Sequence, residues 1–166
     1  MAINNIVDES FIINQKKLKQ FGDRCSNVKI GIMGGTFDPI HYAHLATAEF
    51  IRDNYKLDKI LFIPSGNPPH KKGNITDKYD RYNMVLLSTV NNDDFIVSDI
   101  EIKREKSTYT IDTLKVLKQI YKNAEIYFIT GADAICDIET WKDVEGNFKL
   151  ANFIAATRPG ISLLRA

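Results

Sequence analysis

The sequence has little of what marks secreted, membrane-embedded or nucleic-acid-binding proteins. Only two of its 166 residues are cysteines, Cys25 and Cys136. We expect free thiols in a reducing cytoplasm, with a disulfide between them as the alternative. The formal net charge is +1, so no strong field attracts nucleic acid or a membrane surface.

Long apolar runs are also missing. None approaches the roughly 20 residues that cross a bilayer, and the N-terminus lacks a basic start followed by an apolar stretch, so no secretory signal is predicted. The length suits one compact domain with its own core. We expect a cytoplasmic protein whose partners are small molecules.

Apolar strand patterns alternate with amphipathic helix patterns along most of the chain. This order predicts an α/β fold, a Rossmann-like open parallel sheet with helices on both faces. Ligands then bind beyond the carboxyl ends of the strands. Residues 1–27 are interpreted as an N-terminal extension with a helix near 9–21, and residues 28–166 as the domain. The expected strands are 28–33, 59–63, 95–98, 125–130 and 152–157, and the expected helices are 43–54, 77–90, 110–121, 131–138 and 143–150.

The most informative segment runs from Lys29 to Leu45, where an apolar strand enters a glycine turn. His41 and His44 follow at the mouth of a predicted helix. Glycines admit a phosphate close to the backbone, a helix N-terminus favours an anion, and two imidazoles can stabilise developing charge. The glycine spacing fits neither a P-loop nor a dinucleotide fingerprint. A zinc-binding histidine pair and two merely solvated histidines are the alternatives.

Other predicted loops carry polar or aromatic side chains with more than one interpretation. In the proline-rich loop of residues 64–76, amide and basic groups can face anionic oxygens or form an ordinary basic surface. Thr110 is a good N-cap, and Trp141 suits either ring stacking or a half-buried position. Glycines 131 and 160 lie after strands, where turns are also expected. The loop candidates are Asn67, His70, Lys71, Lys72, Tyr109, Thr110, Gly131, Asp133, Trp141 and Arg158.

The stretch Gly-Gly-Thr-Phe-Asp-Pro-x-His-x-x-His, which begins at Gly34, resembles the H-x-G-H signature of the nucleotidyltransferase superfamily. Together with the Pro-Pro-His-Lys and Tyr-Thr-Ile-Asp segments, it is similar to the bacterial nicotinate-nucleotide adenylyltransferases over about residues 28–160. Ala43 departs from the signature, which usually has glycine there. We expect alanine to be tolerated if the position is helical and not if it requires a positive φ.

The resemblance implies adenylyl transfer from ATP to nicotinate mononucleotide, giving deamido-NAD and pyrophosphate in NAD biosynthesis. The catalytic residues would be His41 and His44, and Mg²⁺ would arrive with ATP rather than in a carboxylate cage. ATP would also contact Gly34, Gly35, Thr36, Phe37, Gly131, Asp133 and Arg158. Nicotinate mononucleotide would contact Asn67, His70, Lys71, Tyr109, Thr110 and Trp141.

The family usually continues past the point where this chain stops, with a loop that helps to hold the triphosphate. Residues 161–165 echo that loop only faintly, and we interpret the echo as chance. The sequence is therefore interpreted as apparently lacking the C-terminal part. The alternatives are a nucleotide-binding remnant without turnover, or another superfamily enzyme such as pantetheine-phosphate adenylyltransferase or a cytidylyltransferase. The oligomeric state stays open, with a homo-oligomer among the options.

Overall fold

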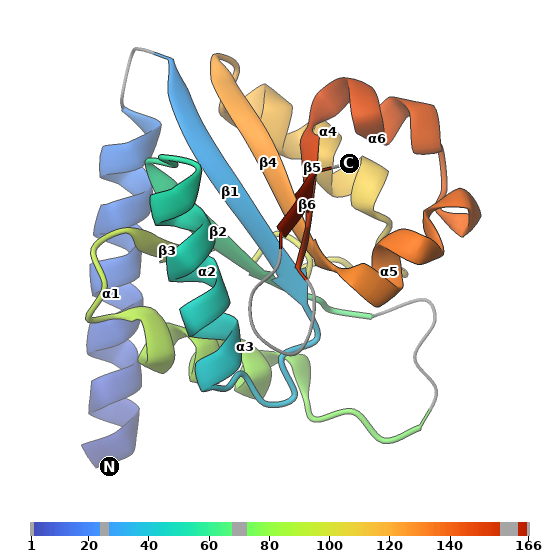
Figure 1. Cartoon of the computed structure of the whole chain (residues 1–166). Helices are drawn as coiled ribbons and strands as arrows, with labels where there is room; N and C mark the ends of the chain where they lie inside the picture. The colour runs from blue at the N-terminus through green and yellow to red at the C-terminus, as the bar shows by residue number, and fades with distance from the viewer. Residues whose placement is uncertain (1, 24–26, 68–72, 157–162, 166) are drawn as a thin grey trace.

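A six-stranded sheet in the order β3-β2-β1-β4-β5-β6 forms the centre of the computed structural model, which describes residues 2–23, 27–67, 73–156 and 163–165 (Figure 1). The first five strands are mutually parallel, which confirms the predicted open sheet. The sixth, which was not predicted, pairs antiparallel with β5. The strands are β1 (Val28–Gly35), β2 (Lys59–Pro64), β3 (Phe95–Val97), β4 (Ala124–Gly131), β5 (Asn152–Ala156) and β6 (Leu163–Arg165).

Helices cover both faces of the sheet, as predicted, and the core divides accordingly. Along β2, Ile60 and Phe62 face the side covered by α2 and α3, while Leu61 and Ile63 face the side covered by α4 and α6. Side chains of a strand alternate between faces, so a strand buried on both faces is a continuous apolar run. The helices are α2 (Tyr42–Asn54), α3 (Lys78–Thr89), α4 (Thr110–Ile120), α5 (Ala132–Cys136) and α6 (Val144–Leu150).

Two helix predictions need correction. Thr110 is not the N-cap of α4, because the helix already begins there and the carbonyl of Tyr109 accepts from the N–H groups of Asp112 and Thr113. The single helix predicted for residues 131–138 is instead α5 followed by a 3₁₀ turn, Ile138–Thr140. The chain leaves the α-helix at Asp137, which separates the two.

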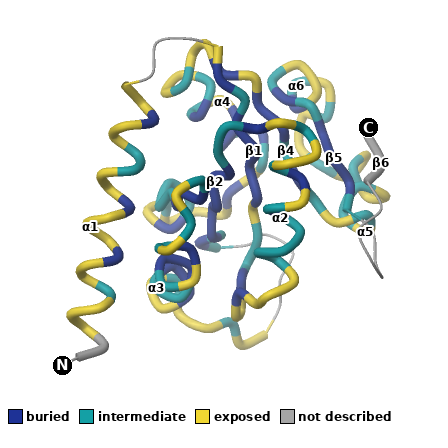
Figure 2. The backbone as a smooth tube through the Cα atoms, turned by 60° about the vertical axis from the view of Figure 1, so that its left-hand side comes forward, coloured by how far each residue is buried: buried dark blue, intermediate teal, exposed yellow. Residues whose placement is uncertain are grey.

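The N-terminal residues form α1 (Ala2–Gly22), a helix that starts well before the predicted residue 9. It lies along the outer edge of the sheet beside β3 and α3, with its outer side exposed (Figures 1 and 2). Its inner side carries buried Ser10, Asn14 and Phe21. No helix among the described residues has both the length and the apolar character needed to span a membrane.

Polar contacts attach α1 to the rest of the molecule. The Asn14 amide donates to the carbonyl oxygen of Val97 (2.9 Å) and accepts from the Val97 N–H (2.8 Å), as a neighbouring strand would. Lys17 Nζ donates to four carbonyl oxygens, those of Thr89, Val90, Asn92 and Phe95. The helix thereby covers backbone groups that an edge strand leaves open.

Candidate active site

The predicted site loops meet at the carboxyl ends of β1, β2 and β4. Gly35 pairs with Pro64 on β2, and Gly131 lies level with Gly35 because Met33 pairs with Ile129 two residues earlier. The chain turns to one side of β1 through β2 and β3, and to the other through β4 and β5. The loops therefore flank the point where strand order reverses, the usual ligand position in such sheets.

The turn between β1 and α2 is built around Phe37, which is only 3% exposed although its φ is 50°. A bulky residue in the left-handed region is strained unless its surroundings hold it. The Phe37 ring is held against Phe62, at 6.1 Å between centroids, and edge-on against His44, at 5.2 Å. A Cβ on Gly35 would press on the Phe37 ring at 3.2 Å. Glycine at 35 lets the aromatic ring fill the turn.

The two signature histidines stand side by side at the N-terminus of α2, with ring centroids 3.9 Å apart. The backbone N–H of His41 donates to Nδ1 of His44 at 3.1 Å. A nitrogen that accepts this bond carries no hydrogen, so the neutral His44 ring has its hydrogen on Nε2. His44 is thus a hydrogen-bond donor beside a helix N-terminus, where partial positive charge favours an anion.

Ala43, the departure from the signature, lies in the first turn of α2 and is not among the described residues with positive φ. The backbone condition for tolerating alanine is therefore met.

The described part of the chain contains no group of three or more His, Cys, Asp and Glu side chains placed to hold a metal ion.

The segments predicted for the pyridine nucleotide also come together. Tyr109, 38% exposed, precedes α4, and Lys142 Nζ lies 5.0 Å from the centre of its ring. The neighbouring Trp141 is half-buried, with its ring 6.1 Å from Phe128 and 6.0 Å from Phe153. The structure therefore places Tyr109 next to the Trp141 segment, although the two residues are 32 positions apart in sequence.

Asn67 lies at the same end of the sheet and fastens one loop to another. Its side-chain amide donates to the carbonyl oxygens of Arg104 (3.3 Å) and Glu105 (2.9 Å). A Cβ on the preceding Gly66 would collide with the carbonyl oxygen of Glu101. The loop after β2 therefore lies directly on the loop after β3, and glycine at 66 permits that contact.

Sequence reasoning missed two residues here, Glu101 and Arg81. Burial raises the pKa of Glu101 to about 7, against the opposing effect of a hydrogen bond from the Thr113 hydroxyl at 3.0 Å. Arg81 is 1% exposed on α3 and donates to backbone carbonyl groups of the surrounding loops. It follows the same helical spacing as the buried Val85. A charged residue at a core position was the available signal.

The remaining predicted residues make few contacts that define the site, or lie outside the described ranges. Gly131 precedes α5 as its N-cap, and Asp133 is exposed in the first turn of that helix. Cys136 is a free, exposed thiol. The predictions for Cys25, His70, Lys71, Lys72 and Arg158 fall on residues outside the described ranges.

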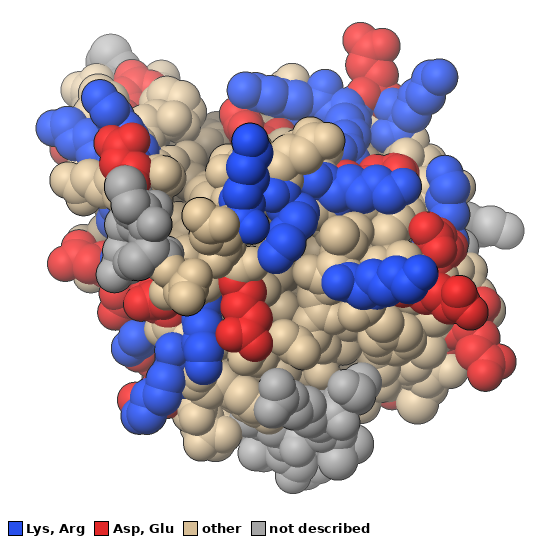
Figure 3. Space-filling view, turned by 90° about the horizontal axis from the view of Figure 1, so that it is seen from above, with Lys and Arg blue, Asp and Glu red and all other residues tan. Residues whose placement is uncertain are grey.

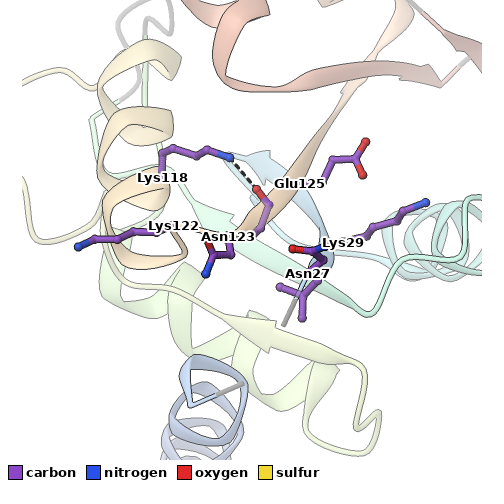
Figure 4. A pocket seen from close by; sticks show the side chains of 8 residues that line it. Asn27, Lys29, Lys118, Lys122, Asn123 and Glu125 are labelled. Carbon is purple, nitrogen blue, oxygen red and sulfur yellow. Dashed lines mark hydrogen bonds between the residues drawn. The ribbon is translucent and has the colours of Figure 1, made fainter. Parts of the chain in front are cut away.

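A separate pocket of about 370 Å³ opens at the amino ends of β1 and β4, where lysine side chains gather (Figures 3 and 4). Lys29, Lys118 and Lys122 line it, and Lys118 Nζ donates to the carbonyl oxygen of Ala124 at 2.7 Å. This is the opposite end of the sheet from the loops described above. None of the residues predicted for the site lines this pocket.

Comparison with known proteins agrees with the fold. The family model described as cytidylyltransferase-like matches residues 32–165. A probable nicotinate-nucleotide adenylyltransferase of Thermoanaerobacter sp. (strain X514) is 58% identical over 136 residues, which make up 81% of this chain and 64% of the relative. A relative of the same name from Desulfitobacterium hafniense (strain Y51) is 53% identical over 137 residues, 82% of this chain and 66% of the relative.

A solved structure has a similar fold. Nicotinic acid mononucleotide adenylyltransferase of Plasmodium falciparum, complexed with NaAD, superposes with a TM-score of 0.71 at 29% identity, covering 81% of this chain and 67% of that one. The chain spans slightly less than two thirds of the length of the two bacterial relatives.

Proposed function

Because the chain belongs to the cytidylyltransferase-like family, we propose that it transfers an adenylyl group from ATP to nicotinate mononucleotide. The products are deamido-NAD and pyrophosphate. The observation that carries the proposal is the pair His41 and His44 at the N-terminus of α2, beside the glycine end of β1. The names of the relatives support the choice of acceptor.

The proposed mechanism needs neither a general base nor a covalent intermediate. The phosphate of nicotinate mononucleotide is largely dianionic at neutral pH, since its second pKa is about 6. It attacks the α-phosphorus of ATP in line with the departing pyrophosphate, so catalysis consists of positioning and charge stabilisation. His44 donates through Nε2 to a phosphate oxygen as negative charge shifts toward the leaving group. Mg²⁺ would be held by the triphosphate and would offset part of its negative charge.

The acceptor is proposed to lie at the carboxyl ends of the strands, between the loop after β2 and the segments that carry Tyr109 and Trp141. Asn67, His70 and Lys71 would contact its phosphate, while Tyr109, Thr110 and Trp141 would contact the pyridine ring. Trp141→Ala is then expected to raise the KM for nicotinate mononucleotide while leaving the KM for ATP unchanged, in steady-state kinetics. An unchanged KM for nicotinate mononucleotide would remove Trp141 from the site.

Pyrophosphate release tests the proposed function. ATP and Mg²⁺ are supplied with nicotinate mononucleotide, nicotinamide mononucleotide or phosphopantetheine in parallel reactions. We expect release with nicotinate mononucleotide far above that with phosphopantetheine, and a deamido-NAD product by mass spectrometry. Release with phosphopantetheine alone would move the chain to another adenylyltransferase. Nucleotide binding without release from any acceptor would contradict catalysis by this chain.

A further inference from the structure

Arg81 hydrogen-bonds to three separate loop segments at once. Its Nε donates to the carbonyl oxygen of Thr76 (2.8 Å), and one terminal nitrogen donates to those of Thr36 (2.8 Å) and Ser65 (2.6 Å). The other terminal nitrogen donates to the carbonyl oxygen of Gly66 (3.2 Å). These acceptors come from the turn after β1, the loop after β2 and the approach to α3.

Burial of the charged Arg81 guanidinium is electrostatically unfavourable. Burial lowers the pKa of Arg81, and the nearby carboxylates of Asp38 and Asp77 partly oppose that effect. Asp38 also accepts from the backbone N–H of Thr76 at 3.0 Å, so both backbone groups of Thr76 are held. A guanidinium offers five donors in a rigid fork, which an ammonium group does not reproduce.

Because peptide groups are planar, these hydrogen bonds also fix the direction of the N–H groups on the opposite side of each loop. In a trans peptide the C=O and the next N–H point in opposite directions, and the described cis bond is elsewhere, at Asp38–Pro39. Carbonyl groups drawn toward Arg81 therefore direct the N–H groups of Phe37, Gly66 and Asn67 away from it. Two of these three residues, Phe37 and Asn67, were predicted to contact substrate.

We propose that Arg81 is a positioning residue: by holding the carbonyl groups of Thr36, Ser65 and Gly66, it presents the following backbone N–H groups to the anionic groups of the substrates. The identity of the ligands rests on the proposed function, whereas the orientation of the loops does not.

Two substitutions on the same helix separate positioning from stability. Arg81→Lys keeps a positive charge but cannot reach three segments at once. Val85→Ala, one turn later and fully buried, removes core contacts and leaves the guanidinium of Arg81 in place. Hydrogen–deuterium exchange is the main readout, since it does not depend on turnover. We expect Arg81→Lys to accelerate exchange selectively in segments 35–38, 65–67 and 75–77, and Val85→Ala to accelerate it in the core without that selectivity.

Kinetics provide the second readout. Misplacement by about 1 Å costs on the order of 10²-fold in rate, so we expect kcat/KM to fall by about that factor in Arg81→Lys. The same parameter should change less than about threefold in Val85→Ala, because the hydrogen bonds of Arg81 to the loop carbonyl groups remain. Equal exchange in wild type and Arg81→Lys, or the same loop-selective exchange in Val85→Ala, would overturn the proposal. Absence of turnover in the wild type would instead count against the proposed function.

The wild-type chain provides a test if Arg81→Lys does not fold. ATP with Mg²⁺ and nicotinate mononucleotide are titrated separately into ¹⁵N-labelled protein. We expect the amide resonances of Phe37, Gly66 or Asn67 to shift with at least one of them. Shifts elsewhere upon binding, with these three amides unmoved, would contradict the inference. If neither compound binds, loop exchange in wild type is compared with that in Arg81→Gln by the same criterion.

Discussion

A backbone hydrogen bond and a ring contact help to fix the orientation of His44. The His41 N–H holds Nδ1, and the edge of the Phe37 ring holds the imidazole plane. Both contacts exist before any substrate arrives, so the Nε2 donor is preorganised. Preorganised donors act on charge that develops in the transition state and add little to ground-state binding.

Replacement of His44 by alanine should therefore lower turnover much more than ATP affinity. We expect kcat to fall on the order of 10²–10³-fold, the usual loss for one such donor, while the Kd for ATP changes only a few-fold. Initial rates and calorimetric titration with ATP measure the two quantities. Tyr42→Ala is the matched control, because Tyr42 lies between the histidines and is 82% exposed. Near-normal turnover in His44→Ala would end the catalytic assignment.

Buried Glu101 should make the free energy of unfolding depend on pH. Its pKa of about 7 lies above the ordinary value of 4.5 for a glutamate, so between these pH values the folded state binds a proton that the unfolded state has released. Stability from this carboxyl group is therefore lost as pH rises from about 4.5 to 7. The penalty above pH 7 is on the order of 3 kcal/mol, from about 2.5 pKa units at 1.36 kcal/mol each.

The variant Glu101→Gln removes that titration. Relative to wild type, we expect it to gain free energy of unfolding between pH 5 and pH 8, as measured by urea denaturation at several pH values. Glu105→Gln is the control, since Glu105 is exposed nearby. A difference between Glu101→Gln and wild type that stays constant across this range would show that Glu101 does not titrate there.

At the scale of the element, α1 shows where sequence reasoning loses accuracy. The strands from β1 to β5 were predicted to within two residues because continuous apolar runs bounded by turns are a strong signal. The inner face of α1 instead presents buried Ser10 and Asn14 beside Lys17, and the side chains of Asn14 and Lys17 bond to backbone groups. Polar residues interrupt the apolar period of this face, which is left to residues such as Leu18 and Phe21 near its end, so the predicted helix was too short.

Asn14→Ala should destabilise the fold through β3. Removal of the amide leaves the N–H and C=O of Val97 without their partner, at about 1–3 kcal/mol for each unsatisfied group. We expect a loss of about 2–4 kcal/mol in urea-induced unfolding, accompanied by concentration-dependent association if the freed strand edge pairs between molecules. Gln15→Ala, on the exposed side of the same helix, should change stability by less than about 0.5 kcal/mol. Equal effects of the two substitutions would mean that the Asn14 contacts contribute nothing.

Across the whole molecule, the loop positions were predictable and the framework that orients them was not. The carboxyl ends of parallel strands meet at one edge, which brought Gly35, Asn67 and Gly131 to the same region from topology alone. Arg81 acts through carbonyl oxygens of three loops, and no sequence pattern encodes which carbonyl groups converge. Its placement depends on the loops and α3 folding together.

The two ends of the sheet should behave independently, although both could attract anions. β1 has eight residues, and at about 3.3 Å per residue it separates the lysine-lined pocket from the site by roughly 26 Å. The Debye length is about 8 Å at 0.15 M salt and about 30 Å at 0.01 M. Lys122→Glu should therefore leave the KM for ATP within about twofold at 0.15 M salt and raise it modestly at 0.01 M. A tenfold rise at 0.15 M would mean that the lysine-lined pocket takes part in binding the nucleotide, and would move part of the site to the amino ends of the strands.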